Sequence, residues 1–504
     1  MKVNKLNGIS RATISLVGLY AIYLILLALS INRHELWGDE LHSFNIAKAS
    51  STFGDLNYNS RYEGHPPLWY TLLFIVTRFS HEPVYMQYLH FFISALLAFV
   101  LVFRLKFSLL QNVLILFSYF FFYEYGVLSR NYALGLFFAL LICSEFQKGE
   151  QLKAWKYYLF LFLLTQTHVL GFMLAASFQV YFLMCLKSEK PGMKLKHLLF
   201  SALMLMPALY FIFPPSNSAL GTDFWLSIWT KDRLFMSMQA PIKAFMPIPA
   251  FWEDHFWNTE FLIAMQSRFG LLKFILPVLS LFLLFIVVYI LRADKKALLF
   301  FVVNLVLTLT FSLIFPLSSS RYVGFLFVAF IVAFSLSGQS QLLTKKQSSA
   351  FYTLLVLQFC GTMIGVSKDW SLPFSESNHV KSLYTQVPDK STLITDYWCL
   401  NDAVAFLDEP VYCVGFNTQK SFLLWDKALK QLMQEDSLYT KGTAAAMLLN
   451  HKTVLYLMTN KNAEELNESD VHFLLSYQVD LIRNYSEAIE KHSNLYLYRI
   501  SLKQ

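Results

Sequence analysis

Residues 12–40 read ATISLVGLYAIYLILLALSINRHELWGDE, an apolar run followed within a few residues by two adjacent carboxylates. The run at 12–31 has the length that an α-helix needs to cross the hydrocarbon core of a bilayer. It is too long for the core of a signal peptide and shows no small-residue cleavage site, so we interpret it as an uncleaved anchor. The charged residues that precede it are basic: Lys2, Lys5 and Arg11. This bias predicts a cytoplasmic amino end.

Composition extends this interpretation to the whole chain. Of the 504 residues, 56% are hydrophobic and 15% are charged, whereas soluble domains carry roughly 25% charged residues. Long apolar runs recur, so we predict a polytopic α-helical membrane protein. The formal net charge of +8 does not indicate a nucleic-acid partner, because most basic residues lie in short loops between apolar runs, where the orientation of a membrane protein places them.

The predicted number of spans depends on one short run, 66–79, which falls below the ~20 residues that a spanning helix needs. If this run spans, the most basic loops of the chain face outward, against the positive-inside bias. If it lies only at the interface, the same loops face the cytoplasm. We therefore predict about eleven spans, with 66–79 as a juxtamembrane or re-entrant helix. Besides 12–31, the predicted spans are 84–103, 107–123, 132–146, 155–167, 170–186, 197–213, 271–291, 297–315, 322–336 and 351–366.

Beyond residue 367 the apolar character is lost, and short β-like runs alternate with helical ones. The β-like runs are 392–397, 411–416, 454–458 and 495–500, and the helical ones are 421–434, 443–449 and 463–476. We therefore predict a membrane domain at 1–367, with outside loops at about 32–83 and 214–270, and an extracytoplasmic α/β domain at 368–504. Cys399 and Cys413 fall in the second domain, where a disulfide could persist, although sequence alone gives no geometry for one.

The adjacent acids Asp39 and Glu40 lie in the first predicted outside loop, at the mouth of the membrane domain. Charged groups beside a bilayer are costly and require an explanation. Neighbouring side chains diverge on a helix or strand, so the pair is not expected to chelate one ion together. Asp39 is the candidate general base, with Glu40 in support. The alternative is structural: a helix cap followed by a first-turn acid.

Further polar candidates are predicted on the same side of the membrane as Asp39. They are His65, Arg130, Tyr132, His168, Arg321 and Tyr322. An arginine near a tyrosine at two span ends suits the clamping of a lipid phosphate, and a partly charged His65 suits a hydrogen bond to the same group. The structural alternatives are snorkelling anchors for the arginines and buried or helix-start positions for the histidines. The aromatic-rich loop at 214–270 predicts an interfacial belt, a platform for sugar or lipid, or both.

In their order and spacing these motifs resemble those of the polyprenyl-phosphate-dependent glycosyltransferases of the GT-C fold. Within that family the chain is similar to the protein O-mannosyltransferase, aminoarabinose transferase and RgtA/B/C/D-like group. The resemblance covers the predicted membrane domain and is strongest towards its amino end. The matching features are Asp39-Glu40, His65-Pro66-Pro67-Leu68, Arg130-Asn131-Tyr132, His168 and the large loop at 214–270. The chain departs from the eukaryotic mannosyltransferases in having no lectin-like domain inserted in that loop.

The resemblance implies an inverting membrane glycosyltransferase. Its donor would be a sugar on polyprenyl (undecaprenyl) phosphate, and its acceptor lipid A or lipopolysaccharide, another glycan or a protein, on the periplasmic side of a bacterial inner membrane. Asp39 would be the base, and the phosphate would be held by His65, Arg130, Tyr132, His168, Arg321 and Tyr322. No cofactor is implied, and a divalent metal is not favoured, because protein cations can stabilise a monophosphate leaving group. A polytopic lipid or sugar transporter (flippase) and a non-catalytic scaffold of the same fold stay open as alternatives.

Overall fold

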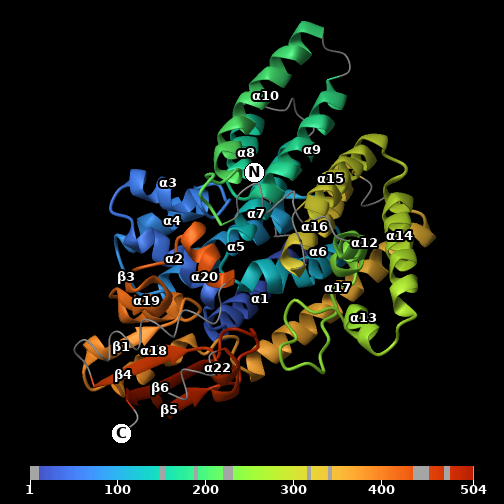
Figure 1. Cartoon of the computed structure of the whole chain (residues 1–504). Helices are drawn as coiled ribbons and strands as arrows, with labels where there is room; N and C mark the ends of the chain where they lie inside the picture. The colour runs from blue at the N-terminus through green and yellow to red at the C-terminus, as the bar shows by residue number, and fades with distance from the viewer. Residues whose placement is uncertain are drawn as a thin grey trace, which may run out of the picture.

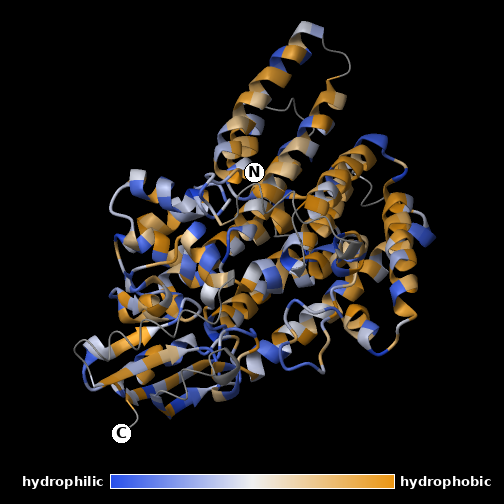
Figure 2. Cartoon of the chain, in the orientation of Figure 1, coloured by the Kyte–Doolittle hydropathy of each residue, from blue (hydrophilic) through white to orange (hydrophobic). Residues whose placement is uncertain are grey.

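The computed structural model describes residues 11–147, 154–186, 191–219, 231–314, 319–338, 343–434, 453–469 and 477–502. In this part of the chain six helices are long and apolar enough to cross a membrane. They are α1 (Arg11–Arg33), α5 (Val84–Arg104), α10 (Pro191–Ile212), α14 (Leu272–Leu291), α15 (Lys295–Ile314) and α17 (Lys345–Ser371). These helices are hydrophobic over most of their length (Figure 2). The protein is therefore mainly helical with several helices of membrane-spanning length, as predicted.

Shorter apolar helices pack between the long ones (Figure 1). They are α7 (Tyr132–Gln147), α8 (Ala154–Thr165), α9 (Val169–Cys185) and α16 (Ser320–Leu336). α16 is the most enclosed of them, because every residue from Val323 to Leu336 is buried. A helix that is apolar on all sides needs such a position, surrounded by other helices.

The predicted span at 107–123 is not one continuous helix. α6 (Leu109–Leu116) ends within this run, and a π-helical segment, η1 (Tyr119–Val127), follows after a short break. The hydroxyl of Thr362 on α17 donates a hydrogen bond to the carbonyl of Phe117, at 2.8 Å, which satisfies a backbone acceptor at the break. The apolar run could not reveal the break, since both pieces are hydrophobic.

Three short helices occupy the predicted loop at 32–83: α2 (Gly38–Ala49), α3 (Phe53–Arg61) and α4 (Leu68–Thr77). The ten residues of α4 extend about 15 Å, which is too short to cross a bilayer and agrees with the prediction that 66–79 does not span. The guanidinium of Arg78, just after α4, donates to the carbonyls of Lys48 and Ser50. These bonds fix α4 against the end of α2.

Part of the predicted outside loop at 214–270 packs against the helices of the membrane domain. It contains α12 (Lys231–Phe245), which packs against α14, α15 and α16. The Ser312 hydroxyl on α15 donates to the Ser237 hydroxyl at 2.7 Å, and α17 donates through Gln358 to the carbonyl of Ala244 at 2.7 Å. A mixture of polar and apolar residues in α12 concealed this helix from an analysis based on apolar runs.

A mixed sheet forms the centre of the C-terminal domain, in the strand order β3-β2-β1-β4-β6-β5. β1 runs parallel to β2 and β4, and the remaining pairs are antiparallel. The strands are β1 (Leu393–Thr395), β2 (Val411–Cys413), β3 (Thr418–Lys420), β4 (Val454–Thr459), β5 (Tyr477–Tyr485) and β6 (Leu495–Leu502). The helices of this domain include α18 (Val380–Thr385), α19 (Leu400–Leu407), α20 (Lys427–Gln434) and α22 (Ala463–Ser469). In the membrane domain, a short helix, α13 (Phe261–Ala264), precedes α14.

The predicted α/β pattern of this domain is confirmed, with differences in detail. Each of the predicted β-like runs contains a strand, but β3 and β5 were not predicted. β5 forms an edge of the sheet and exposes Leu481 and Ile482, so it lacks a clear alternating pattern. The predicted helix at 443–449 and the end of the one at 463–476 lie outside the described residues. Cys399 and Cys413 are buried and free, so they form no disulfide here.

The C-terminal domain rests on α2 through its helix α19 (Figure 1). The Asn45 amide donates to the carbonyl of Asn401 at 2.8 Å, and the ammonium of Lys48 donates to the carbonyl of Val404 at 2.9 Å. Lys48 also pairs with Asp408 at 3.1 Å. The helix that carries Asp39 is thus held between the two domains.

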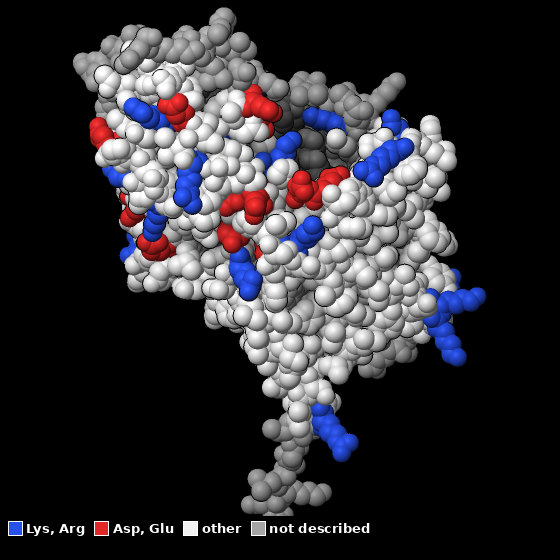
Figure 3. All heavy atoms as spheres, turned by 90° about the horizontal axis from the view of Figure 1, so that it is seen from below, with Lys and Arg blue, Asp and Glu red and all other residues white. Residues whose placement is uncertain are grey.

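In Figure 3, which views the molecule from below, charged side chains of both signs gather on one part of the visible face and leave the rest nearly free of charge.

Candidate functional site

The start of α2 points its two carboxylates in different directions. Trp37 precedes the helix in an extended conformation, and its backbone N–H donates to Glu40 Oε2 at 3.1 Å. Successive residues of an α-helix are turned by about 100°, so Glu40 faces inward and Asp39 outward. Glu40 is fully buried, whereas the Asp39 side chain is 37% exposed. Glu40 is therefore bonded within the fold, whereas Asp39 is the member of the pair that solvent or a ligand can reach.

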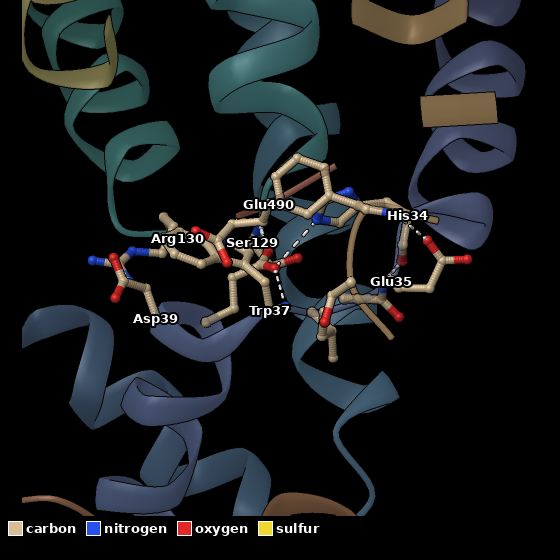
Figure 4. A network of polar contacts seen from close by, with 12 residues as sticks. His34, Glu35, Trp37, Asp39, Ser129, Arg130 and Glu490 are labelled. Atoms are coloured by element: carbon tan, nitrogen blue, oxygen red, sulfur yellow. Dashed lines mark hydrogen bonds and ion pairs between the residues drawn. The ribbon is translucent and has the colours of Figure 1, made fainter. Parts of the chain in front are cut away.

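Glu40 belongs to a buried network that joins distant parts of the chain. Figure 4 labels three of its partners: His34, Trp37 and Ser129. Oε1 of Glu40 accepts from the backbone N–H of Ser129, and its Oε2 lies 3.2 Å from Nε2 of His34. The other ring nitrogen of His34 lies 3.2 Å from Oδ2 of Asp369 on α17. Burial lowers the pKa of His34, but Asp369 and Glu40 raise it more, to about 10. His34 is therefore a buried cation between two carboxylates, and Glu40 braces the site without facing it.

Asp39 receives two arginines, Arg130 from the loop between η1 and α7 and Arg321 from α16. Nη2 of Arg321, at the start of α16, lies 3.0 Å from Asp39 Oδ2, and Nη1 of Arg130 lies 3.4 Å from the same oxygen. Burial raises the pKa of Asp39, but Arg130 and then Arg321 lower it more, so its pKa lies below the ordinary value of 3.8. The carboxylate is consequently ionised at neutral pH. Figure 4 shows Asp39 and Arg130 pointing toward one another.

Arg321 is held by aromatic rings. Its guanidinium carbon lies 5.3 Å from the ring centre of Trp37, 5.7 Å from that of Trp257 and 5.2 Å from that of Tyr322. Such contacts orient a cation without using its N–H donors. Trp257 is itself fixed by Glu124, which accepts from its indole N–H at 3.2 Å. Sequence analysis did not identify Trp257 as the support of Arg321, because no pattern connects residues so far apart.

Several buried donors around Asp39 lack an acceptor. Within the described part of the chain, Nε and Nη1 of Arg321, the Tyr132 hydroxyl and Nδ1 of His65 have no hydrogen-bond partner. Burial, Arg130 and Arg321 lower the pKa of His65 to about 3. The expectation that His65 is partly charged is therefore wrong, because two arginines and a dry environment favour the neutral ring. A neutral imidazole still donates one hydrogen bond.

His168 lies behind these donors. It caps α9 by accepting from the backbone N–H of Gly171 at 3.0 Å, and it is fully buried. Its ring packs on Tyr132, at 5.1 Å between centroids, and on Phe325 at 4.6 Å. A side chain at Gly135 would collide with it. This geometry gives His168 a supporting position behind Tyr132, and a direct contact with phosphate stays a prediction.

The aromatic loop contributes to the site in part. Phe224, Trp225 and Trp229 lie outside the described residues. Trp257 is nearly buried against Trp37, with ring centroids 4.9 Å apart, whereas Trp252 is partly exposed. One aromatic ring of the loop therefore packs into the Asp39 site.

The exposed side of Asp39 opens into a cavity of about 160 Å³ beneath the C-terminal domain. Sequence analysis did not find the residues that this domain contributes, which include Trp398, Asp402, Glu490 and His492. A signal was nevertheless present: Trp398 and Asp402 follow the β-like run at 392–397, and polar residues after such a strand often line a site.

Comparison of the sequence with protein-family models and with curated proteins gives no match to either. Function must therefore be inferred from the site itself.

Proposed function

We propose that the protein is a multi-pass membrane glycosyltransferase of the GT-C fold, with about eleven spans. In this proposal it transfers one sugar, with inversion, from a polyprenyl phosphate to an envelope acceptor. One observation carries the proposal: two arginines, with side chains only 10% and 12% exposed, converge on a partly exposed carboxylate, and Nε and Nη1 of Arg321 have no acceptor in the described part of the chain. A base beside unsatisfied cationic donors suits a reaction in which a proton leaves an acceptor and an anion departs from a donor.

The donor groups suit a phosphate in number and placement. Arg321 can donate through Nε and Nη1, and Tyr132 and His65 can each donate once. Charge-assisted bonds from arginine to phosphate are among the strongest hydrogen bonds in proteins. The phosphodiester of the donor, which becomes a monoester when the sugar leaves, carries the charge and the acceptor oxygens that these groups lack, so we assign the donor phosphate to this position.

The proposed reaction is a single displacement. The acceptor hydroxyl oxygen attacks the anomeric carbon and forms the new C–O bond, while the bond from that carbon to the phosphate oxygen breaks. The leaving oxygen keeps the electron pair as polyprenyl phosphate, which Arg130 and Arg321 stabilise. Asp39 takes the proton of the hydroxyl. One base is sufficient for inversion, whereas retention would require a second carboxyl as nucleophile.

Donor binding would also strengthen the base. Both arginines pair with Asp39 and lower its pKa, and a carboxylate of low pKa is a poor base. When a phosphate engages the same guanidinium groups, its negative charge offsets their effect on Asp39. The pKa of Asp39 then rises, so the base becomes effective only when the donor is in place.

Orientation and location follow the charge bias of the loops. We place Asp39, Arg130 and Arg321 on the periplasmic side of a bacterial inner membrane, because that topology puts the most basic loops in the cytoplasm. In this proposal the lipid-linked donor is used at this surface, and the acceptor would be lipid A, another envelope glycan or a protein.

Replacing Arg321 with glutamine is expected to weaken donor binding. The loss of charge-assisted hydrogen bonds costs about 1.5–3 kcal/mol, so KM for the donor should rise by about 10–100-fold. The measurement is a donor titration with the purified chain in lipid, with Arg268→Gln as control, because Arg268 is an exposed arginine. An unchanged KM in Arg321→Gln would remove Arg321 from the phosphate site.

The same substitution should change the pH profile. Because Arg321 helps to hold the pKa of Asp39 below 3.8, its removal raises that pKa. The protonated, inactive form of Asp39 then persists to higher pH. The acid limb of the pH profile of kcat/KM, which reports the free enzyme, should therefore shift to higher pH. If the limb stays in place or moves to lower pH, the titrating group is not Asp39.

A further inference from the structure

The cavity beside Asp39 is built from both domains. Its membrane-domain side is formed by Trp37, Gly38 and Asp39. The C-terminal domain contributes residues from three places along the chain, among them Trp398, Asn401, Asp402, Trp425, Glu490 and His492. The space next to the proposed base is thus completed by a domain that the family resemblance does not cover.

The cavity lies at the carboxyl end of β1, where the order of the strands reverses: β2 and β3 are added on one side of β1, and β4 on the other. β1 is parallel to β2 on one side and to β4 on the other, and the chain leaves it through α19 toward β2. Open α/β sheets bind ligands at such a switch point, outside the carboxyl ends of the strands. The fold of the C-terminal domain therefore favours a ligand site where the cavity is found.

Asp402 is the side chain that points to a ligand. It is 3% exposed, and its Oδ1 has no hydrogen-bond partner in the described part of the chain. Burial raises the pKa of Asp402 well above its ordinary value, and Glu490 and Asp396 add to the effect. A buried carboxyl oxygen without a partner is costly, and a ligand that donates a hydrogen bond to Oδ1 would relieve that cost.

Aromatic rings surround this carboxyl. Trp398 stacks on His492, with centroids 4.7 Å apart and planes within 16°, and Trp37 and Trp425 also line the space. Glu490 is oriented by the Ser493 hydroxyl, which donates to its Oε2 at 2.7 Å. Indole faces cover the C–H surface of a sugar ring, and carboxylates accept from its hydroxyls.

The charge of the lining selects among ligands. The described lining residues include three acids, Asp39, Asp402 and Glu490. No Lys or Arg is among the described lining residues. Because Asp39 is ionised and the described lining holds no Lys or Arg, the lining disfavours phosphate or carboxylate groups on the ligand. Arg130 and Arg321 lie against Asp39, where the donor phosphate is assigned, so the two sides of Asp39 differ in charge.

We propose that this cavity is a binding subsite for a sugar ring that carries no acidic group, and that it presents a hydroxyl of that ring to Asp39. The role as acceptor subsite rests on the proposed function, whereas the binding of a sugar ring does not. The acceptor is then a glycan or glycolipid, and the C-terminal domain selects it.

The test is direct binding to the full chain in lipid nanodiscs, followed by saturation-transfer NMR. The probes are glucose, galactose and mannose, with glucosamine and glucose 6-phosphate as a charged pair. At least one neutral sugar should receive saturation, glucosamine should bind at least as well as glucose, and glucose 6-phosphate should not bind. Trp398→Leu and the nearly isosteric Asp402→Asn should each weaken binding by about tenfold. Trp155→Leu should bind as the wild type does, because Trp155 on α8 is 63% exposed.

Binding of none of the neutral sugars would overturn the subsite, as would equal binding of glucose 6-phosphate. Wild-type affinity in both Trp398→Leu and Asp402→Asn would also overturn it. Sugar binding as predicted, in a protein that turns over no polyprenyl phosphate donor, would support the subsite while the proposed function fails. Donor turnover without sugar binding at this cavity would leave the proposed function standing and reject the subsite.

Discussion

Replacing Asp39 with asparagine is expected to lower the rate of sugar transfer by about 10²–10⁴-fold, the contribution that a general base makes to such a step. The amide keeps the size of the side chain but cannot take the proton of the acceptor hydroxyl. The partial exposure of Asp39 and its position outside the Glu40 network predict that the variant folds. The measurement is the rate of product formation with the purified chain at saturating donor.

A matched control separates loss of the base from loss of a negative charge. Glu82 lies in the same outer segment with a 61% exposed side chain, so Glu82→Gln should retain the wild-type rate. Donor binding to Asp39→Asn should also persist, because Arg130 and Arg321 remain. A variant that transfers sugar at the wild-type rate would eliminate Asp39 as the base.

The second large effect concerns stability. His34→Gln removes the buried cation between Glu40 and Asp369 and leaves two carboxylates without their partner. Breaking a buried ion pair in this way costs about 3–5 kcal/mol, which we expect in the free energy of unfolding measured in mixed micelles. His81→Gln is the control, because His81 pairs with Asp408 at an exposed position, where ion pairs contribute about 0–1 kcal/mol.

The same network sets a pH dependence. The pKa of His34 is raised from 6.5 to about 10 in the folded protein. A raised pKa contributes stability that is complete below 6.5 and is lost as pH rises through about 10. The wild type should therefore lose stability over this interval, and His34→Gln should lose less. Equal slopes for the two proteins would show that His34 is not the buried cation.

Local composition was sufficient for the broad architecture. The apolar run at 12–31 becomes α1, and the short β-like runs of the tail become strands of one sheet, because burial and strand propensity are properties of neighbouring residues. The break after α6 and the packing of α12 were not predictable in this way. Both depend on which helices surround a segment, and a single sequence does not state that.

The site, like the fold, was predictable from the sequence only in part. Asp39, Arg130 and Arg321 were placed on one side of the membrane by parity, and the structure brings their side chains together. The partners of Glu40 were missed because they come from distant segments: 335 positions separate His34 from Asp369. Asp402 was missed for the same reason, since the packing of α19 on α2 helps to bring the C-terminal domain to Asp39.

The most direct test of the central claim, that the Asp39 site transfers a sugar from a polyprenyl phosphate, is mass spectrometry of envelope glycolipids and lipid-linked sugars. It compares cells that lack the protein with cells that regain either the wild type or Asp39→Asn at equal abundance. We predict that the wild type adds the mass of one sugar to an envelope component and that Asp39→Asn does not. The donor should accumulate in cells with the variant. Identical envelope profiles in all of these cells, or restoration of the added sugar by Asp39→Asn, would contradict the account.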